Sequence, residues 1–180
     1  MTKNVLFGLL LINSVFAHDR VIAAEPPINL YTLDSTWHNA TEGVENLAGF
    51  KGKKVVFAMF YASCQSSCPL IVKKMQKIEA VLKAKHIAAE FVIVSIDFEH
   101  DQAKALTQFR EHMGLKDSYW HTLHGTEQAT RRLANYLEIK FSRPTPNNDI
   151  MHDNKILLFD EHGALVRVIE GVGGDIAELF

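Results

Sequence analysis

The stretch YASCQSSCPL, from Tyr61 to Leu70, holds the only two cysteines of the chain, Cys64 and Cys68. It overlaps the end of VVFAMFYAS, residues 55–63, a continuous apolar run rich in β-branched and aromatic residues. A run of this length and composition predicts a strand covered on both faces. The cysteines therefore lie just beyond the end of a buried strand, and their surroundings decide how the rest of the chain is interpreted.

A helix is predicted directly after the cysteines. Pro69 suits the first helical position, where its missing N–H would have no intrahelical partner. The apolar residues that follow recur at helical spacing as far as about Lys85: Leu70, Ile71, Met75, Ile78 and Leu82. The dithiol motif is thus expected at the start of a helix.

The remaining pattern alternates between strands and helices. Strands are predicted at residues 90–97, 120–123, 155–160 and 164–171, and helices at residues 101–114, 126–140 and, at the end, from residue 173. INLYTL (28–33), with the turn-prone NATEG and FKGKK after it, predicts an N-terminal hairpin, whereas FSRPTPNNDIMHD (141–153) predicts a loop. This order predicts an α/β thioredoxin-like fold, a central mixed sheet flanked by helices with an extra N-terminal β-hairpin.

The first 24 residues are interpreted as a targeting segment. MTKN is weakly positive, an apolar run follows, and small residues place a signal cleavage after Ala17 or Ala24. A short uncleaved anchor is the alternative, although the run is short for a bilayer span. Residues 25–180 are then one domain, exported to the bacterial periplasm, soluble or tethered to the inner membrane. That compartment is oxidising, so a disulfide is possible.

Charge excludes some partners. With 19 basic and 21 acidic residues, the formal net charge is -2, which gives no electrostatic surface for nucleic acid or an anionic membrane. Membrane contact is expected only through the N-terminal anchor or a partner. The nine histidines supply many nitrogen ligands, but His121 and His124, three apart on a short strand, do not share a face and argue against a metal site there.

The position of the cysteines predicts reactive thiols. Free N–H groups and the positive end of a helix dipole stabilise thiolates and lower their pKa. Three residues separate Cys64 from Cys68, where thioredoxin-type enzymes have two. If the segment is nearly helical, this spacing puts both sulfurs on one face with Cβ atoms within roughly 6 Å. A disulfide, a catalytic dithiol and a pair of metal ligands all remain open.

The best candidate for a third metal ligand is His152. Thiolates favour Cu(I), with Zn(II) as a competitor, and two of them leave room for an imidazole. His152 lies directly before a predicted strand, and in a thioredoxin-like fold the corresponding loop returns beside the dithiol.

Three landmarks together resemble the Sco/SenC family of copper-binding, thioredoxin-like proteins, which assist assembly of the copper site of cytochrome c oxidase. They are CQSSCP (64–69), VSIDFEHD (94–101) and the histidine before KILLFDEHG (155–163). The resemblance implies that Cys64, Cys68 and His152 bind one copper ion, as Cu(I), Cu(II) or both, while Asp97 or Asp101 shapes the neighbouring loop. It also implies a partner, the copper-site subunit of the oxidase, together with other copper chaperones or thiol reductants.

The chain departs from the family pattern at three positions. Phe98 stands where the family usually has proline, and His100 where it often has arginine. Asp153 replaces the small hydroxyl residue that commonly follows the histidine, and we expect its carboxylate to draw the imidazole into a different hydrogen bond.

Three functions are compatible with this sequence. The first, which the sequence favours over an enzyme, is a copper metallochaperone. The second is a thiol:disulfide oxidoreductase that reduces the cysteines of the oxidase copper-site subunit, in which one thiolate attacks and the other resolves the mixed disulfide. The third is a non-catalytic domain in which Cys64 and Cys68 form a structural disulfide.

Overall fold

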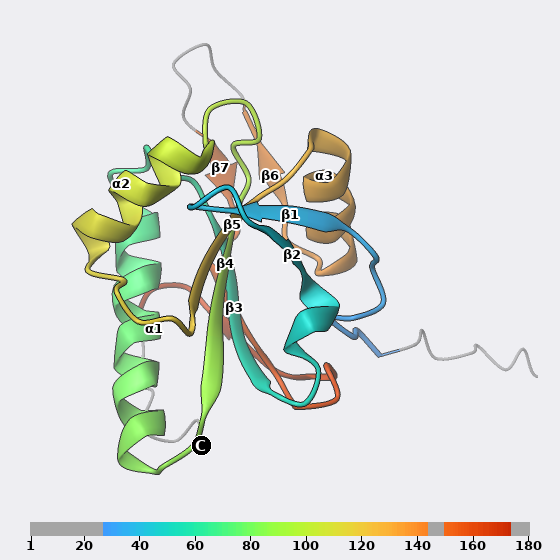
Figure 1. The fold of residues 1–180 in the computed structure, drawn as a ribbon, viewed down its shortest axis with the longest axis vertical. Coiled ribbons are helices and arrows are strands. Elements are labelled where there is room, and N and C mark those ends of the chain that lie inside the picture. The colour runs from blue at the N-terminus through green and yellow to red at the C-terminus, as the bar shows by residue number, and fades with distance from the viewer. Residues whose placement is uncertain (1–26, 144–149, 174–180) are drawn as a thin grey trace, which may run out of the picture.

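The structure is a computed structural model that describes residues 27–143 and 150–173. Its strands are β1 Thr36–Asn39, β2 Val44–Asn46, β3 Lys54–Phe60, β4 Ala89–Ser95, β5 Trp120–His124, β6 Phe141–Ser142, β7 Met151–His152, β8 Lys155–Phe159 and β9 Leu165–Glu170. Its helices are α1 Ser67–Ala84, α2 Ala103–Met113 and α3 Glu127–Tyr136, with a 3-10 helix at Leu47–Phe50. Figure 1 shows the elements in place.

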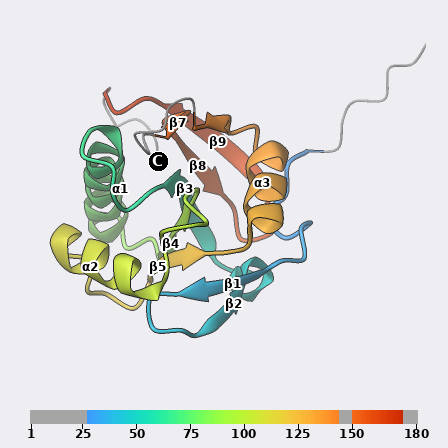
Figure 2. The ribbon, with the colours of Figure 1, turned by 90° about the horizontal axis from the view of Figure 1, so that it is seen from above.

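A mixed seven-stranded sheet organises the molecule, with the order β2-β1-β5-β4-β3-β8-β9. β3, β4 and β5 run parallel, whereas β8, β9, β1 and β2 are added in antiparallel pairs. Helices α1 and α2 cover one face and α3 lies on the other (Figures 1 and 2). The predicted thioredoxin-like architecture, a central mixed sheet flanked by helices, is confirmed.

The central strands are buried as their composition predicts. Every residue of β3 from Val55 to Phe60 is buried, and so is every residue of β4 from Phe91 to Ser95. Since helices lie on both faces, the strands have no polar side that needs solvent. Their parallel alignment brings the carboxyl ends of β3, β4 and β5 to one edge of the sheet, and the dithiol loop leaves β3 at this edge.

The N-terminal hairpin is present, but its strands lie later than INLYTL. They are β1 and β2, joined by the predicted NATEG turn. The earlier segment forms only an isolated bridge between Asn29 and Ala164. Asn29 accepts from the backbone N–H groups of Tyr31, through its side chain, and of Thr32, through its carbonyl. These bonds turn the chain, as asparagine commonly does, and outweigh the alternating pattern.

The end of α2 and the start of α3 agree with the sequence signals, but α3 ends at Tyr136 and not at residue 140 as predicted. Gly114 ends α2 with φ 70°, and the Thr126 side chain caps α3 by accepting from Ala129 N. Helix α1 begins at Ser67, so Pro69 is its third residue and not its first. Proline is accepted there because the first four N–H groups of a helix have no intrahelical partner.

The segment predicted as a loop before β8 contains two short strands. β6 and β7 pair Phe141 with His152 and Ser142 with Met151. The prolines of this segment lie among residues 144–149, outside the described residues, as do the targeting segment and the final helix predicted from residue 173, of which only Gly173 is described. Within 27–143 and 150–173, no helix is long and apolar enough to cross a membrane.

Candidate metal centre

The dithiol is held by the loop between β3 and α1. Cys64 lies in this loop, where its N–H donates to the Tyr61 carbonyl at 3.2 Å, while Cys68 is the second residue of α1. Both thiols are free and buried, with Cys64 6% and Cys68 0% exposed. The sulfurs therefore do not share a helix face as the spacing suggested. The turn of the loop brings Cys64 to the helix start instead.

The start of α1 stabilises the Cys64 thiolate. The Cys68 N–H donates to Cys64 Sγ at 3.4 Å, and the Ser66 hydroxyl lies 3.6 Å from the same sulfur. Burial by itself would raise the pKa of Cys64, but these groups, with the Cys68 thiol and the Ser66 N–H, lower it to about 6. Cys64 is thus mostly a thiolate at neutral pH.

Cys68 has the opposite character. Burial raises its pKa far above the ordinary value, and the nearby charges of the Cys64 thiolate and Asp101 raise it further. A hydrogen bond with the Tyr61 backbone only partly opposes this rise. The pair therefore consists of a thiolate at Cys64 and a thiol at Cys68, and Cys68 gives up its proton only to a base or to a metal that replaces it.

His152 lies beside Cys68, although 84 residues separate them in the chain. Its Nε2 is 3.3 Å from Cys68 Sγ, and its Nδ1 is 3.0 Å from the Asp153 carbonyl. A carbonyl only accepts, so Nδ1 carries the proton and Nε2 presents a lone pair to the sulfur. Burial lowers the pKa of His152, against the opposing effect of Asp153, and keeps the ring neutral as a ligand must be.

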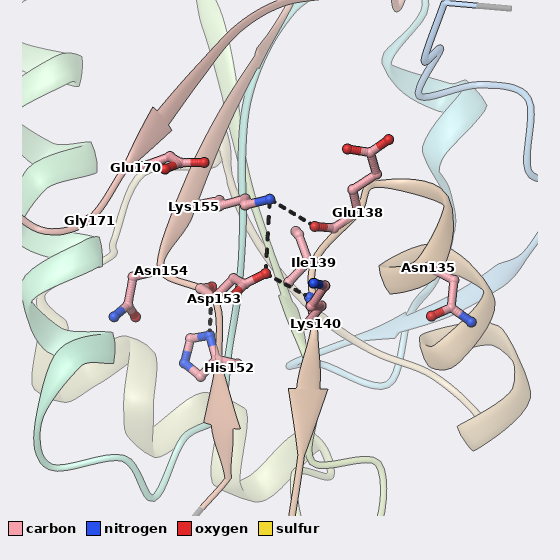
Figure 3. Close-up of a pocket in the computed structure, with 10 residues that line it drawn as sticks. All are labelled: Asn135, Glu138, Ile139, Lys140, His152, Asp153, Asn154, Lys155, Glu170 and Gly171. Carbon is pink, nitrogen blue, oxygen red and sulfur yellow. Dashed lines mark hydrogen bonds and ion pairs between the residues drawn. The ribbon is translucent and has the colours of Figure 1, made fainter. Parts of the chain in front are cut away.

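The expected effect of Asp153 on the imidazole is wrong. The carboxylate turns away from His152 and accepts from Lys140 N at 3.0 Å, while the backbone carbonyl of Asp153 orients the ring. Figure 3 shows both bonds beside a polar cavity of about 850 Å³ lined by His152, Asp153, Lys140 and Lys155, among others. The ring orientation is thus set by the backbone.

Asp101 supports the dithiol loop. It is buried, and its Oδ2 accepts from Ala62 N at 2.7 Å and from the Ser95 hydroxyl at 2.6 Å. Burial raises the pKa of this carboxyl, although the two donors oppose the rise. The carboxyl thus links Ala62, which lies two residues before Cys64, to Ser95 at the end of β4. These two bonds fix the position of the loop.

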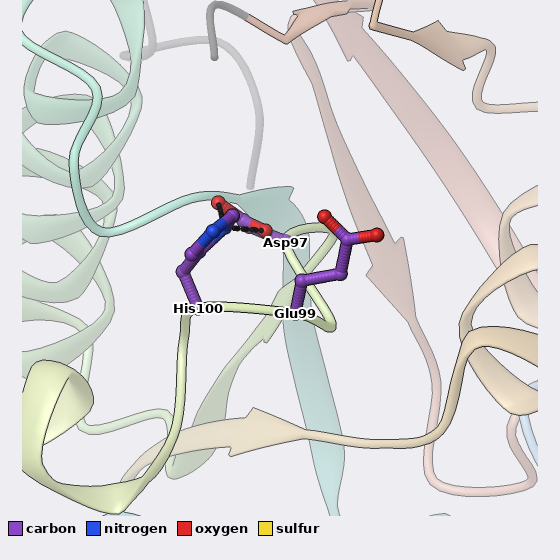
Figure 4. Close-up of side chains that lie close together, drawn as sticks. All are labelled: Asp97, Glu99 and His100. Carbon is purple, nitrogen blue, oxygen red and sulfur yellow. Dashed lines mark hydrogen bonds and ion pairs between the residues drawn. The ribbon is translucent and has the colours of Figure 1, made fainter.

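Asp97 belongs to a neighbouring cluster and does not cap α2 with its side chain. Arg143 donates to its Oδ1 at 2.7 Å, and His100 Nδ1 lies 2.9 Å from the same oxygen. Figure 4 shows His100 against this carboxylate, with Glu99 beside them. The cap of α2 is Gln102, which makes no side-chain capping bond. A lone arginine in a predicted loop gave no sequence signal for this contact.

The ligand atoms of the Asp97 cluster lie closer together than those of the dithiol and His152. Within the described residues, only Asp97, Glu99 and His100 form a group of three ligating side chains whose donor atoms all lie within 4.8 Å of one another. Arg143 already forms an ion pair with each of the two carboxylates of that group. Cys64, Cys68 and His152 do not meet this criterion together, so the three side chains would have to approach one another to hold one ion.

The SCO1/SenC family model matches residues 35–178 of this chain. The chain belongs to the SCO1/SenC family. A SCO1 protein homolog from Bacillus subtilis (strain 168) is 24% identical to it over 149 residues, which cover 81% of this chain and 77% of the relative.

Solved structures of SCO1/SenC proteins show the same fold. BsSco, a member of the Sco family of cytochrome c oxidase assembly proteins with an identified disulfide switch, superposes with a TM-score of 0.72 and 21% identity, covering 84% of this chain and 90% of BsSco. Arabidopsis thaliana ScoI, solved with copper bound, superposes with a TM-score of 0.70 and 14% identity, covering 81% of this chain and 90% of ScoI.

Proposed function

We propose that this protein is an exported metallochaperone that carries one copper ion on Cys64, Cys68 and His152 and assists maturation of the copper site of cytochrome c oxidase. The observation that carries the proposal is the 3.3 Å approach of His152 Nε2 to Cys68 Sγ, with Nδ1 anchored on a backbone carbonyl. An imidazole whose second nitrogen is fixed in this way is the common form of a metal-ligating histidine.

The donor set suits copper as cargo. Two sulfurs favour Cu(I), and an imidazole nitrogen makes Cu(II) tolerable in the same site. Cys64 is already deprotonated at neutral pH, His152 is neutral, and Cys68 would release its proton on binding. Asp101 holds the loop that must close over the ion.

The names of similar proteins support the proposed partner, the copper-site subunit of cytochrome c oxidase. Arabidopsis thaliana ScoI holds copper, and BsSco belongs to a family of cytochrome c oxidase assembly proteins. We infer that the oxidase copper-site subunit receives the ion, and that other copper chaperones or thiol reductants supply or prepare this protein. Residues 1–24 act as signal or anchor in this proposal, which puts residues 25–180 in the bacterial periplasm as one domain.

The unequal thiols favour a second candidate function, reduction of a partner disulfide. The Cys64 thiolate attacks one sulfur of that disulfide, which forms a mixed disulfide and releases one partner thiolate. Cys68 then loses its proton and attacks Cys64 Sγ, so the second partner thiol leaves and a Cys64–Cys68 disulfide remains. A thiol reductant must regenerate the pair.

Anaerobic competition between the reduced protein and a Cu(I) chelator tests the first function. We expect one tightly bound ion per chain, lost in Cys64→Ser and Cys68→Ser and at least ten-fold weaker in His152→Ala. The matched control is His112→Ala, an exposed histidine on α2, which should bind as the parent does.

Weak binding, or binding that none of the three changes affects, would overturn the chaperone proposal. The reduction potential of Cys64 and Cys68 would then separate the other two functions. A potential near that of thiol reductants would support the oxidoreductase, while a far lower one would indicate a structural disulfide.

A further inference from the structure

Two histidines face each other at the junction of the N-terminal hairpin and the main sheet. His38 on β1 and His124 on β5 are direct partners in an antiparallel pair. Side chains of such partners project from the same face of the sheet. Their ring centroids are 5.5 Å apart, with an angle of 34° between the planes. Two imidazoles thus converge from strands that are far apart in sequence.

The inner ring of this pair has an unsatisfied nitrogen. His124 is 7% exposed, and its Nε2 is buried without a hydrogen-bond partner in the described part of the chain. A buried polar atom without a partner costs about 1–3 kcal/mol, so a water or an ion commonly occupies such a position. His38 is half-buried and gives access from solvent.

We propose that His38 and His124 form a second metal site, which takes a borderline divalent cation and prefers Cu(II) to Zn(II). Imidazole nitrogen suits both ions, and Cu(II) binds more strongly to a given set of nitrogen ligands. Burial and the charge of His38 lower the pKa of His124, which keeps that ring neutral and able to bind. The negative charge of Glu42, in the hairpin turn, opposes this lowering of the pKa, and it also favours a cation at the site.

This site is separate from the dithiol. His124 ends β5, and β4 lies between β5 and β3, the strand that leads to Cys64. Strands are spaced about 4.8 Å apart, so β5 and β3 lie about 10 Å apart, and His38 on β1 lies one strand further from β3. The sequence argument against pairing His121 with His124 holds, because His121 instead lies between Glu45 and Glu90. His124 instead pairs with His38, which lies on another strand, so the spacing of histidines along one strand does not reveal this pair.

Titration of the full-length chain with Cu(II), followed by electron paramagnetic resonance, tests this site. The parent for the test is the variant Cys64→Ser, Cys68→Ser and His152→Ala, which removes the proposed thiol site and so makes the outcome independent of the proposed function. We expect one Cu(II) with nitrogen hyperfine structure. Adding His38→Gln should weaken its binding at least ten-fold, and adding His112→Gln should leave it unchanged.

Equal Cu(II) binding with and without His38→Gln would overturn the proposal, and so would a parent that binds no Cu(II). A water at His124 Nε2 would explain that second outcome. Circular dichroism of each variant at the titration temperature ensures that a loss of binding is not a loss of folding. If His38→Gln unfolds the chain, His124→Asn in the same parent gives the second test, with the same expected loss.

Discussion

At the scale of single residues, the unequal environments of the two cysteines have a direct chemical consequence. Because its pKa is about 6, Cys64 should react with iodoacetamide at pH 7, and the rate should fall with a midpoint near pH 6 on acidification. Cys68 should stay unmodified there, since burial holds its pKa far above neutral. Mass spectrometry of each cysteine over a pH series measures both rates.

The source of the low pKa is also testable. The Ser66 hydroxyl lies 3.6 Å from Cys64 Sγ, so Ser66→Ala should move the midpoint to higher pH. Ser118→Ala, at a serine far from the sulfur along the chain, is the control and should not move it. A midpoint near the ordinary value of 9.0 in the parent would contradict the proposed stabilisation by the start of α1.

A second residue-scale prediction concerns the carboxylate beside the metal-ligand candidate. Asp153→Ala removes the acceptor for Lys140 N but leaves the backbone carbonyl that orients His152. We expect the free energy of unfolding to fall by about 1 kcal/mol, the usual value of one such bond. Cu(I) affinity should change less than three-fold. A ten-fold loss of affinity would mean that the carboxylate itself orients the ring.

At the scale of elements, prediction from sequence worked where one physical signal dominated. Continuous apolar runs located β3 and β4, and Gly114 and Thr126 marked helix ends that the structure confirms. It failed where a local bond competed with a pattern. INLYTL alternates like a strand, yet the side chain of Asn29 turns it.

A third prediction concerns how the hairpin packs on the end of β5. A Cβ on Gly125 would lie 2.7 Å from two ring carbons of the buried Trp37. Gly125→Ala should therefore lower the free energy of unfolding by about 1–3 kcal/mol, since a rigid aromatic ring cannot give way. Gly49→Ala is the matched control, because a Cβ there meets nothing within 4 Å. Urea unfolding of both variants measures the difference, and equal stabilities would refute the clash.

At the scale of the whole molecule, the candidate site depends on topology that no single motif contains. The cysteine spacing indicated a reactive pair, but the 3.3 Å contact of His152 with Cys68 needs β7 to return beside α1. The sequence named His152 through its place before a predicted strand, and the family resemblance implied the same residue, whereas Arg143 and His38 came only from the structure. Their contacts join segments 46 and 86 residues apart, and such pairings leave no local pattern.

The last prediction concerns an ionic cluster that joins the hairpin to the sheet. His121 on β5 lies 3.0 Å from Glu45 on β2 and 2.9 Å from Glu90 on β4. Burial opposes a charge on His121, but the two carboxylates outweigh it and raise its pKa above the ordinary 6.5. A raised pKa in the folded state gives stability that is complete below pH 6.5 and is lost as pH rises through the raised value.

The carboxylates limit this stability on the acid side. Hydrogen bonding to His121 lowers the pKa of Glu45, and Lys53 and His121 outweigh burial to lower that of Glu90. Their contribution is therefore present above the ordinary value of 4.5 and is lost as pH falls through the lowered values. The cluster should stabilise the fold most between about pH 4.5 and 6.5.

A double-mutant cycle of Glu45→Gln and His121→Gln, followed by urea unfolding, measures this coupling. We expect about 1 kcal/mol at pH 6 and a much smaller coupling at pH 9.5, because the coupling falls as pH rises through the raised pKa of His121. The exposed pair of Lys54 and Glu161, put through the same cycle, is the control, and its coupling should be the same at both pH values. Equal coupling of Glu45 and His121 at both pH values would mean that a neutral hydrogen bond, and not the charge, holds the hairpin to the sheet.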